Sequence, residues 1–150
     1  MNKFVILIIL VFLDFISKYF VSSILIINQN IKINNFFDIV YIKNFGVSFG
    51  LFANTVPYWI LVIIAILVVI LILYLMIISN KKLEKTAYFV IIIGAISNIA
   101  DRAINGYVID FISLHYNNFY WPAFNFADIY ISIGILMVII NIINKFKNNK

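Results

Sequence analysis

The chain has 150 residues, of which 65% are hydrophobic and 11% charged, and its mean hydropathy is +1.08. Soluble globular domains are closer to half apolar and a quarter charged, so this composition excludes a water-soluble globule and indicates an integral membrane protein. Cysteine is absent and histidine occurs once, which excludes disulfide frameworks, cysteine nucleophiles and zinc sites built from Cys or His. The net charge of +5 comes largely from lysines beside apolar runs, a pattern typical of membrane orientation rather than of nucleic-acid binding.

The first apolar run, Phe4 to Val21, is long enough as a helix to span about 27 Å and cross the hydrocarbon core. It follows Lys3 and has the outline of a signal peptide, but Asp14 and Lys18 interrupt its apolar face and no small-residue cleavage site follows. We therefore expect the run to be retained. Asp14 and Lys18 lie one helical turn apart and can form an ion pair that fixes helix packing. Participation of this pair in chemistry, or extension of Lys18 towards the membrane surface, are the alternatives.

Residues 22–54 mix β-branched and aromatic residues with Asn, Lys and Asp, so this segment is not a membrane span. Alternation of apolar residues between Ile31 and Ile42 predicts short strands lying at the membrane surface. Asn44, Gly46 and Gly50 then place an amide and two glycines among aromatic residues, where backbone could approach a bound chain closely. A plain turn explains this last pattern equally well.

Three further apolar runs predict membrane helices at Val56–Ile78, Thr86–Arg102 and Ala127–Ile143. The first of these is uncharged, with Pro57 near its start, so we expect a structural helix that faces lipid. The second carries small and polar residues at the i, i+3, i+4, i+7 spacing of one helix face, which predicts a stripe facing the interior. The residues of this stripe are Gly94, Ser97, Asn98 and Asp101.

Four spans place both termini on one side, and the basic residues indicate which side. Seven lysines belong to the termini and the loop between the second and third spans: Lys3, Lys81, Lys82, Lys85, Lys145, Lys147 and Lys150. Four basic residues fall elsewhere: Lys18, Lys32, Lys43 and Arg102. This asymmetry predicts cytoplasmic termini, so that the segments 22–55 and 103–126 lie outside. We expect residues 1–150 to form a single domain.

Two carboxylates are the best catalytic candidates, because ionisable groups close to lipid are costly and are usually retained for a site. Asp110 lies between apolar residues after a Gly106-Tyr107 turn, and Asp128 opens the last apolar run. Taken singly, Asp110 could be a solvated turn residue and Asp128 a helix cap. Together in a confined site they could share one proton, one acting as base on a water and the other as acid, as in aspartic proteases.

Five sequence blocks, in order, resemble the prolipoprotein signal peptidases, also called type II signal peptidases. The blocks are Asp14-Phe-Ile-Ser-Lys18, Asn44-Phe-Gly46 with Phe49-Gly50, Gly94-Ala-Ile-Ser-Asn98-Ile-Ala-Asp101-Arg102, Gly106-Tyr-Val-Ile-Asp110-Phe111 and Phe124-Asn125-Phe-Ala127-Asp128. The resemblance covers essentially the whole chain. It implies an all-α integral membrane protein with four transmembrane helices and a small β-rich extracytoplasmic cradle.

The resemblance also implies the roles of individual residues. Asp110 and Asp128 would be the catalytic dyad of an aspartic endopeptidase in the bacterial cytoplasmic membrane, with its active site near the outer face. The substrate would be a prolipoprotein whose Cys carries a diacylglyceryl group, cleaved just before that Cys. Five residues would line or support the substrate site: Asn44, Gly46, Asn98, Arg102 and Asn125. Three would be structural: Asp14, Lys18 and Asp101.

We expect no metal or other cofactor, contact with membrane lipid, no nucleic-acid partner and a monomeric enzyme. His115 is interpreted as an interfacial residue within an aromatic belt, since a lone His gives neither a metal site nor an obvious nucleophile pair. One alternative function is a four-span proton- or cation-coupled carrier that uses buried carboxylates, with Asp14 as its best support. The outer position of Asp110 and Asp128 argues against a carrier, whose site belongs near the midplane. A purely structural membrane protein would have no need for so many ionisable groups close to lipid.

Overall fold

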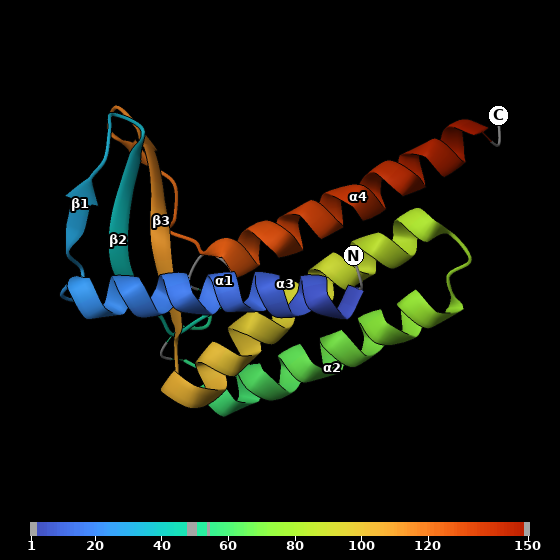
Figure 1. Cartoon of the computed structure of the whole chain (residues 1–150), viewed down its shortest axis with the longest axis horizontal. Helices are drawn as coiled ribbons and strands as arrows, with labels where there is room; N and C mark the ends of the chain where they lie inside the picture. Colours follow the sequence, from blue (N-terminus) through green and yellow to red (C-terminus); the bar gives the residue numbers. More distant parts are fainter. Residues whose placement is uncertain (1–2, 48–50, 54, 149–150) are drawn as a thin grey trace.

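The computed structural model describes residues 3–47, 51–53 and 55–148 and consists of four long helices and a small sheet at one end of them (Figure 1). In chain order the helices are α1 (Lys3–Ile24), α2 (Tyr58–Ile78), α3 (Lys82–Asn105) and α4 (Phe126–Asn148). All four are long and apolar enough to cross a membrane, which confirms the four predicted spans and the expected fold class. Three helices run beyond the predicted apolar cores, most clearly α3, which begins at Lys82 rather than at Thr86, whereas α2 begins at Tyr58, two residues after the predicted start at Val56.

The strands form one antiparallel sheet in the order β1-β2-β3-β4, with β1 at Asn30–Lys32, β2 at Phe37–Asn44, β3 at Val108–Tyr116 and β4 at Phe119–Tyr120. The strands between Ile31 and Ile42 were predicted. The alternative in which Asp110 is a solvated turn residue is wrong, because Asp110 is buried within β3 and pairs with Ile42 of β2. The sheet therefore contains strands from both segments that connect the spans on this side.

A single glycine turns the chain from α3 into β3. Gly106 follows the helix with φ of 80°, a left-handed conformation that glycine adopts without a steric penalty, and its N–H donates to the Arg102 carbonyl at 2.9 Å. In the middle of β3, Ile112 forms backbone hydrogen bonds with Phe124 in both directions, at 2.8 and 3.0 Å. These bonds fix the start of α4 beside the middle of β3, which is where the polar residues gather.

Helices α3 and α4 pack closely because each presents a glycine to the other. A Cβ on Gly94 would lie 2.3 Å from the Ala127 carbonyl oxygen, and one on Gly134 would lie 2.4 Å from Cγ1 of Ile91. Of the predicted interior stripe, Gly94, Ser97 and Asp101 are buried and Asn98 is half-buried. By contrast, α2 buries only Leu61 and Val69 completely, so most of its apolar surface faces outwards, as expected of a helix that contacts lipid.

Candidate active site

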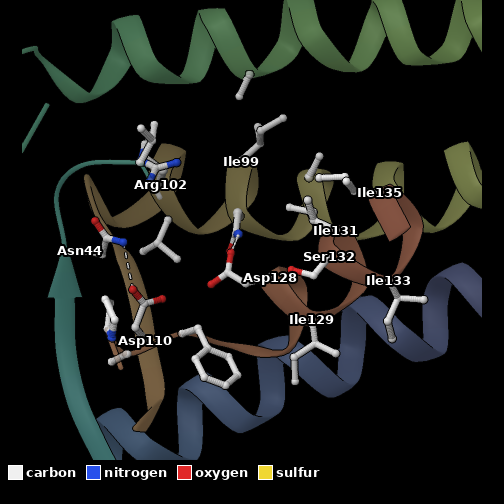
Figure 2. Close-up of a pocket in the computed structure, with 18 of the residues that line it drawn as sticks. Asn44, Ile99, Arg102, Asp110, Asp128, Ile129, Ile131, Ser132, Ile133 and Ile135 are labelled. Carbon is white, nitrogen blue, oxygen red and sulfur yellow. Dashed lines mark hydrogen bonds between the residues drawn. The ribbon is translucent and has the colours of Figure 1, made fainter. Parts of the chain in front are cut away.

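A cavity of about 580 Å³ lies between α2, α3, α4 and the sheet. Its wall is polar near the sheet, where Asn44, Arg102, Asp110 and Asp128 approach it from four different elements (Figure 2). Farther along the helices the wall is apolar and is formed by Ala65, Ile99, Ile131, Ile133 and Ile135. Ile133 and Ile135 are also exposed on the outer surface of the bundle, so the cavity extends to the surface that faces lipid.

Asp110 is buried in the polar part of this cavity, with 3% of its surface exposed. One carboxylate oxygen accepts a hydrogen bond from Nδ2 of Asn44 at 2.9 Å, and the other accepts from Nδ2 of Asn125 at 2.7 Å. The Asn44 amide can point only this way, because its Oδ1 already accepts from the Gly46 N–H at 2.9 Å. Burial, reinforced by the negative charge of Asp128, raises the pKa of Asp110 from its ordinary value of 3.8 to about 7.

Asp128 is the third residue of α4 and forms a reciprocal cap with Asn125, the residue before the helix. The Asn125 N–H donates to Asp128 Oδ2 at 3.1 Å, and the Asp128 N–H donates to Asn125 Oδ1 at 3.0 Å. This is the capping-box arrangement, so Asp128 is not itself the N-cap that its place in the sequence allowed. Its other oxygen, Oδ1, accepts from Nδ2 of Asn98 at 2.9 Å. A capping role alone would not require that second donor or the position of Asp128 at the cavity.

Asn125 connects the two carboxylates and is fully buried. Its N–H and Oδ1 hold Asp128, while its Nδ2 donates to Asp110. Both polar groups of the side-chain amide therefore have a defined partner, and the amide cannot flip without breaking its bonds to the Asp110 carboxylate and to the Asp128 backbone N–H. This single residue fixes the start of α4 relative to the middle of β3.

Arg102 is buried at the cavity wall, where its Nη2 donates to the carbonyl oxygen of Gly46. The contact brings Asn44, Gly46 and Arg102 together, and the role in substrate support that the resemblance implies for them stays a prediction. Within the part of the chain that the structure describes, Nε of Arg102 has no hydrogen-bond partner. Phe49 and Gly50, the other half of the predicted outer-loop motif, lie outside the described residues.

A second polar cluster lies between α1, α3 and the start of α4 and attaches α1 to the bundle. Asp14, which is fully buried, accepts from Lys18 Nζ at 2.7 Å, from the Ala127 N–H at 3.0 Å and from the Ser97 hydroxyl. Lys18 also lies 3.4 Å from Asp101 Oδ2 and donates to Asn98 Oδ1 at 3.0 Å. The predicted Asp14–Lys18 pair is present, but the alternative in which Lys18 extends to the membrane surface is wrong, since only 3% of it is exposed.

Asp101 acts from the end of α3 on the adjoining strand. Its Oδ2 accepts from the Ile109 N–H at 2.9 Å, and its Oδ1 accepts from Asn105. Because Ile109 immediately precedes Asp110, this contact fixes the position of this part of β3 relative to the end of α3. Asp101 thus does not line the cavity, but it helps to place a residue that does.

His115 lies outside the cavity, on β3. Its Nε2 is 3.2 Å from Asp38 Oδ1, and its ring stacks on Tyr120 with the ring centres 5.0 Å apart. The neighbouring aromatic residues Tyr116, Phe119, Tyr120 and Trp121 are exposed, in keeping with the predicted aromatic belt. The Asp38–His115 contact joins β2 to β3 across 77 residues, and no local sequence pattern indicates it.

Four spanning helices that enclose a polar cavity beneath a small sheet define a multi-pass membrane protein with an internal site. A sequence model described as signal peptidase (SPase) II matches residues 6–144 of the chain. The chain therefore belongs to the signal peptidase II family and is a membrane peptidase.

Curated relatives lead to the same family. The chain is 33% identical over 144 residues to the lipoprotein signal peptidase of Francisella tularensis subsp. novicida, covering 93% of this chain and 89% of that protein. It is 38% identical over 128 residues to the lipoprotein signal peptidase of Thermodesulfovibrio yellowstonii, covering 85% of this chain and 84% of that protein. A solved structure described as a bacterial membrane enzyme superposes with a TM-score of 0.88 at 26% identity, over 99% of this chain and 91% of that one.

Proposed function

We propose that this protein is an aspartic endopeptidase that removes the signal peptide from diacylglyceryl-modified bacterial prolipoproteins, cleaving just before the lipidated Cys. The observation that carries the proposal is that Asp110 and Asp128 line one cavity and are bridged by Asn125. The names of the relatives support the choice of substrate class. Cleavage before the lipidated Cys follows from the family resemblance and not from the geometry.

The chemistry needs one proton on the pair of carboxylates. With a pKa of about 7, Asp110 retains a substantial protonated fraction near neutral pH. In this mechanism Asp128, as carboxylate, takes a proton from a water that attacks the scissile carbonyl, while protonated Asp110 donates to the carbonyl oxygen. The tetrahedral intermediate then collapses: the C–N bond breaks, the leaving nitrogen takes the proton that Asp128 received from the water, Asp110 recovers its proton from a hydroxyl of the intermediate, and the new carboxyl group stays on the signal peptide.

The shape of the cavity suits a substrate that enters from the membrane. Its apolar walls of Ile99, Ile131 and Ile135 can take hydrocarbon from the signal peptide or the acyl chains, and its polar end can hold peptide backbone. Arg102 keeps the Gly46 segment at this end, and its Nε is available to donate to a peptide carbonyl. In this proposal Asn44, Asn98 and Asn125 orient the carboxylates and take no part in proton transfer.

We further propose cytoplasmic termini and an outer active site in the bacterial cytoplasmic membrane. The sheet lies at one end of the helices and the α2–α3 connection at the other, so the lysines of that connection and of the end of α4 gather away from the site (Figure 1). This grouping supports the orientation in which basic residues stay inside. All four spans and the sheet together build or brace one cavity, which supports a single domain of residues 1–150. We propose in addition that this domain acts as a monomer without a cofactor.

A cation carrier is not proposed. Its best candidate residue was Asp14, and the oxygens of this carboxylate already accept from Lys18, Ser97 and Ala127. A cation would have to displace the Lys18 ammonium to bind there. The cluster therefore favours a role in holding α1 against α3 and α4.

The test uses two synthetic precursor peptides of the same sequence, one with a diacylglyceryl-modified Cys and one with an unmodified Cys. Purified protein in lipid bicelles should cleave the lipidated peptide and release a product whose first residue is the modified Cys, as mass spectrometry can identify. The unmodified peptide should be cleaved far more slowly. Failure to cleave the lipidated peptide, or cleavage at another bond, would refute the proposal.

A further inference from the structure

Lys18 has more partners than an ion pair with Asp14 needs. Its ammonium group has three hydrogens, and three acceptors surround it: Asp14 Oδ2 at 2.7 Å, Asn98 Oδ1 at 3.0 Å and Asp101 Oδ2 at 3.4 Å. The group is buried, so these protein atoms rather than bulk water satisfy it. One of the three, Asn98, is a neutral amide that also contacts Asp128.

The contact with Lys18 decides which way the Asn98 amide points. An ammonium group can only donate, so it holds the amide oxygen, and the NH₂ group must then face the other way, where it donates to Asp128 Oδ1 at 2.9 Å. A flipped amide would face its NH₂ group against the ammonium and its oxygen against the carboxylate. Both contacts would become repulsive, so the orientation is fixed from α1, 80 residues away in the sequence.

We propose that Lys18 is a positioning residue for Asp128: by fixing the Asn98 amide, it keeps a donor on Asp128 Oδ1 and so holds the carboxylate in its reactive orientation. This inference rests on the proposed function. The other oxygen of Asp128 is held by Asn125, so loss of the Asn98 donor would leave the carboxylate secured on one side only. A water-activating carboxylate that rotates out of place loses rate although substrate still binds.

Part of the attachment of α1 to the bundle does not involve the Lys18–Asn98–Asp128 contacts. Asp14 reaches α3 through the Ser97 hydroxyl and α4 through the Ala127 N–H, and neither bond involves Lys18. Substitutions that remove an Asp14 contact can therefore be compared with substitutions that remove the Lys18–Asn98 contact. This comparison separates a positioning role of Lys18 from a purely structural one. Ser97→Ala removes a partner of Asp14 and leaves the Lys18–Asn98–Asp128 contacts in place, so it serves as the matched control.

The test is a double-mutant cycle of Lys18→Met and Asn98→Leu, with kcat and KM measured on the lipidated peptide and thermal unfolding measured on each variant. If Lys18 acts through Asn98, each single change should lower kcat by roughly 10- to 100-fold with KM near that of the wild type. The double variant should then be no worse than Asn98→Leu within about twofold, because the second change removes an interaction already lost. Lys18→Arg, which keeps a cation that can only donate, should recover part of the rate, and Ser97→Ala should lower the unfolding temperature with kcat little changed.

Losses that multiply in the double variant, or a wild-type kcat in Lys18→Met, would overturn the inference. If Lys18→Met folds poorly, the cycle is measured with Lys18→Gln, which still donates to Asp14 but no longer compels one orientation of Asn98. Losses that multiply in the double variant, or a wild-type kcat in Lys18→Gln, would then overturn the inference. If the wild type itself fails to cleave the lipidated peptide, the proposed function is wrong; if it cleaves and the losses multiply, only the role of Lys18 is wrong.

Discussion

Replacing Gly94 with alanine should separate Asn98 from Asp128, because the close contact of α3 with α4 sets the distance between them. A Cβ at position 94 would lie 2.3 Å from the Ala127 carbonyl oxygen, whereas ordinary van der Waals contact begins at 3.4 Å. The obstructing atom is backbone, so relief requires the start of α4 to move by the difference, about 1 Å. Asn98 follows Gly94 by one turn on the same face, and Asp128 adjoins Ala127.

The displacement would lengthen the Asn98–Asp128 hydrogen bond from 2.9 Å to nearly 4 Å, beyond the length at which it contributes. We expect Gly94→Ala to lower the free energy of unfolding by about 1–3 kcal/mol, as overpacking does. We also expect kcat to fall by roughly 100-fold, because a misplacement of about 1 Å in a catalytic group has that effect. Thermal unfolding in detergent and turnover of the lipidated peptide measure the two quantities on the same preparation.

Gly134→Ala is the matched control, since it overpacks the same pair of helices farther from the site. Its Cβ would lie 2.4 Å from Cγ1 of Ile91 and 2.8 Å from the Ala87 carbonyl oxygen. It should cost a similar amount of stability, yet the folded fraction should keep most of its turnover. Wild-type kcat in folded Gly94→Ala, or equal losses of kcat in the two variants, would refute the link between this helix contact and the carboxylates.

Three shorter predictions concern pH, topology and metal. Because burial and the charge of Asp128 raise the pKa of Asp110 to about 7 and the mechanism needs its proton, kcat/KM should fall about tenfold for each pH unit above that value; a rate that stays flat into the alkaline range would contradict this role. In a chain without natural cysteine, an impermeant thiol reagent on intact cells should label Asn118→Cys and spare Lys82→Cys, and the reverse pattern would refute the topology. Within the described ranges, no group of three or more His, Cys, Asp or Glu residues could hold a metal ion, so EDTA should leave cleavage unchanged, whereas loss restored by a divalent ion would favour a carboxylate–metal site.

The spans and their polar face were predictable because each depends on local spacing alone. An apolar run of membrane length predicts a spanning helix, and the spacing of Gly94, Ser97 and Asp101 places them on one face whatever the rest of the fold does. Strand β3 was not predicted, since Val108, Ile109, Asp110 and Phe111 are all buried. A strand buried on both faces lacks the alternation that identifies half-buried strands.

The contacts that make the site depend on tertiary structure and lie beyond local pattern. Lys18 meets Asn98 across 80 residues, and Asn44 meets Asp110 across 66. The one local signal that was available is the pair Asn125 and Asp128, three residues apart before an apolar run, which is the spacing of a capping box. That pattern would have identified Asn125, rather than Asp128, as the N-cap of α4.

The most direct test of the central claim is the turnover of Asp110→Asn, Asp128→Asn and the double variant on the lipidated precursor peptide. If the two carboxylates act as one unit on one water, each single change should lower kcat by roughly a thousandfold or more, and the double variant should be little worse than either. Asp38→Asn is the matched control, because Asp38 is a buried carboxyl paired with His115 away from the cavity, and it should keep near-wild-type turnover. Substantial cleavage by folded Asp110→Asn or Asp128→Asn, at a normal protein level, would contradict the assignment of these residues as the catalytic pair.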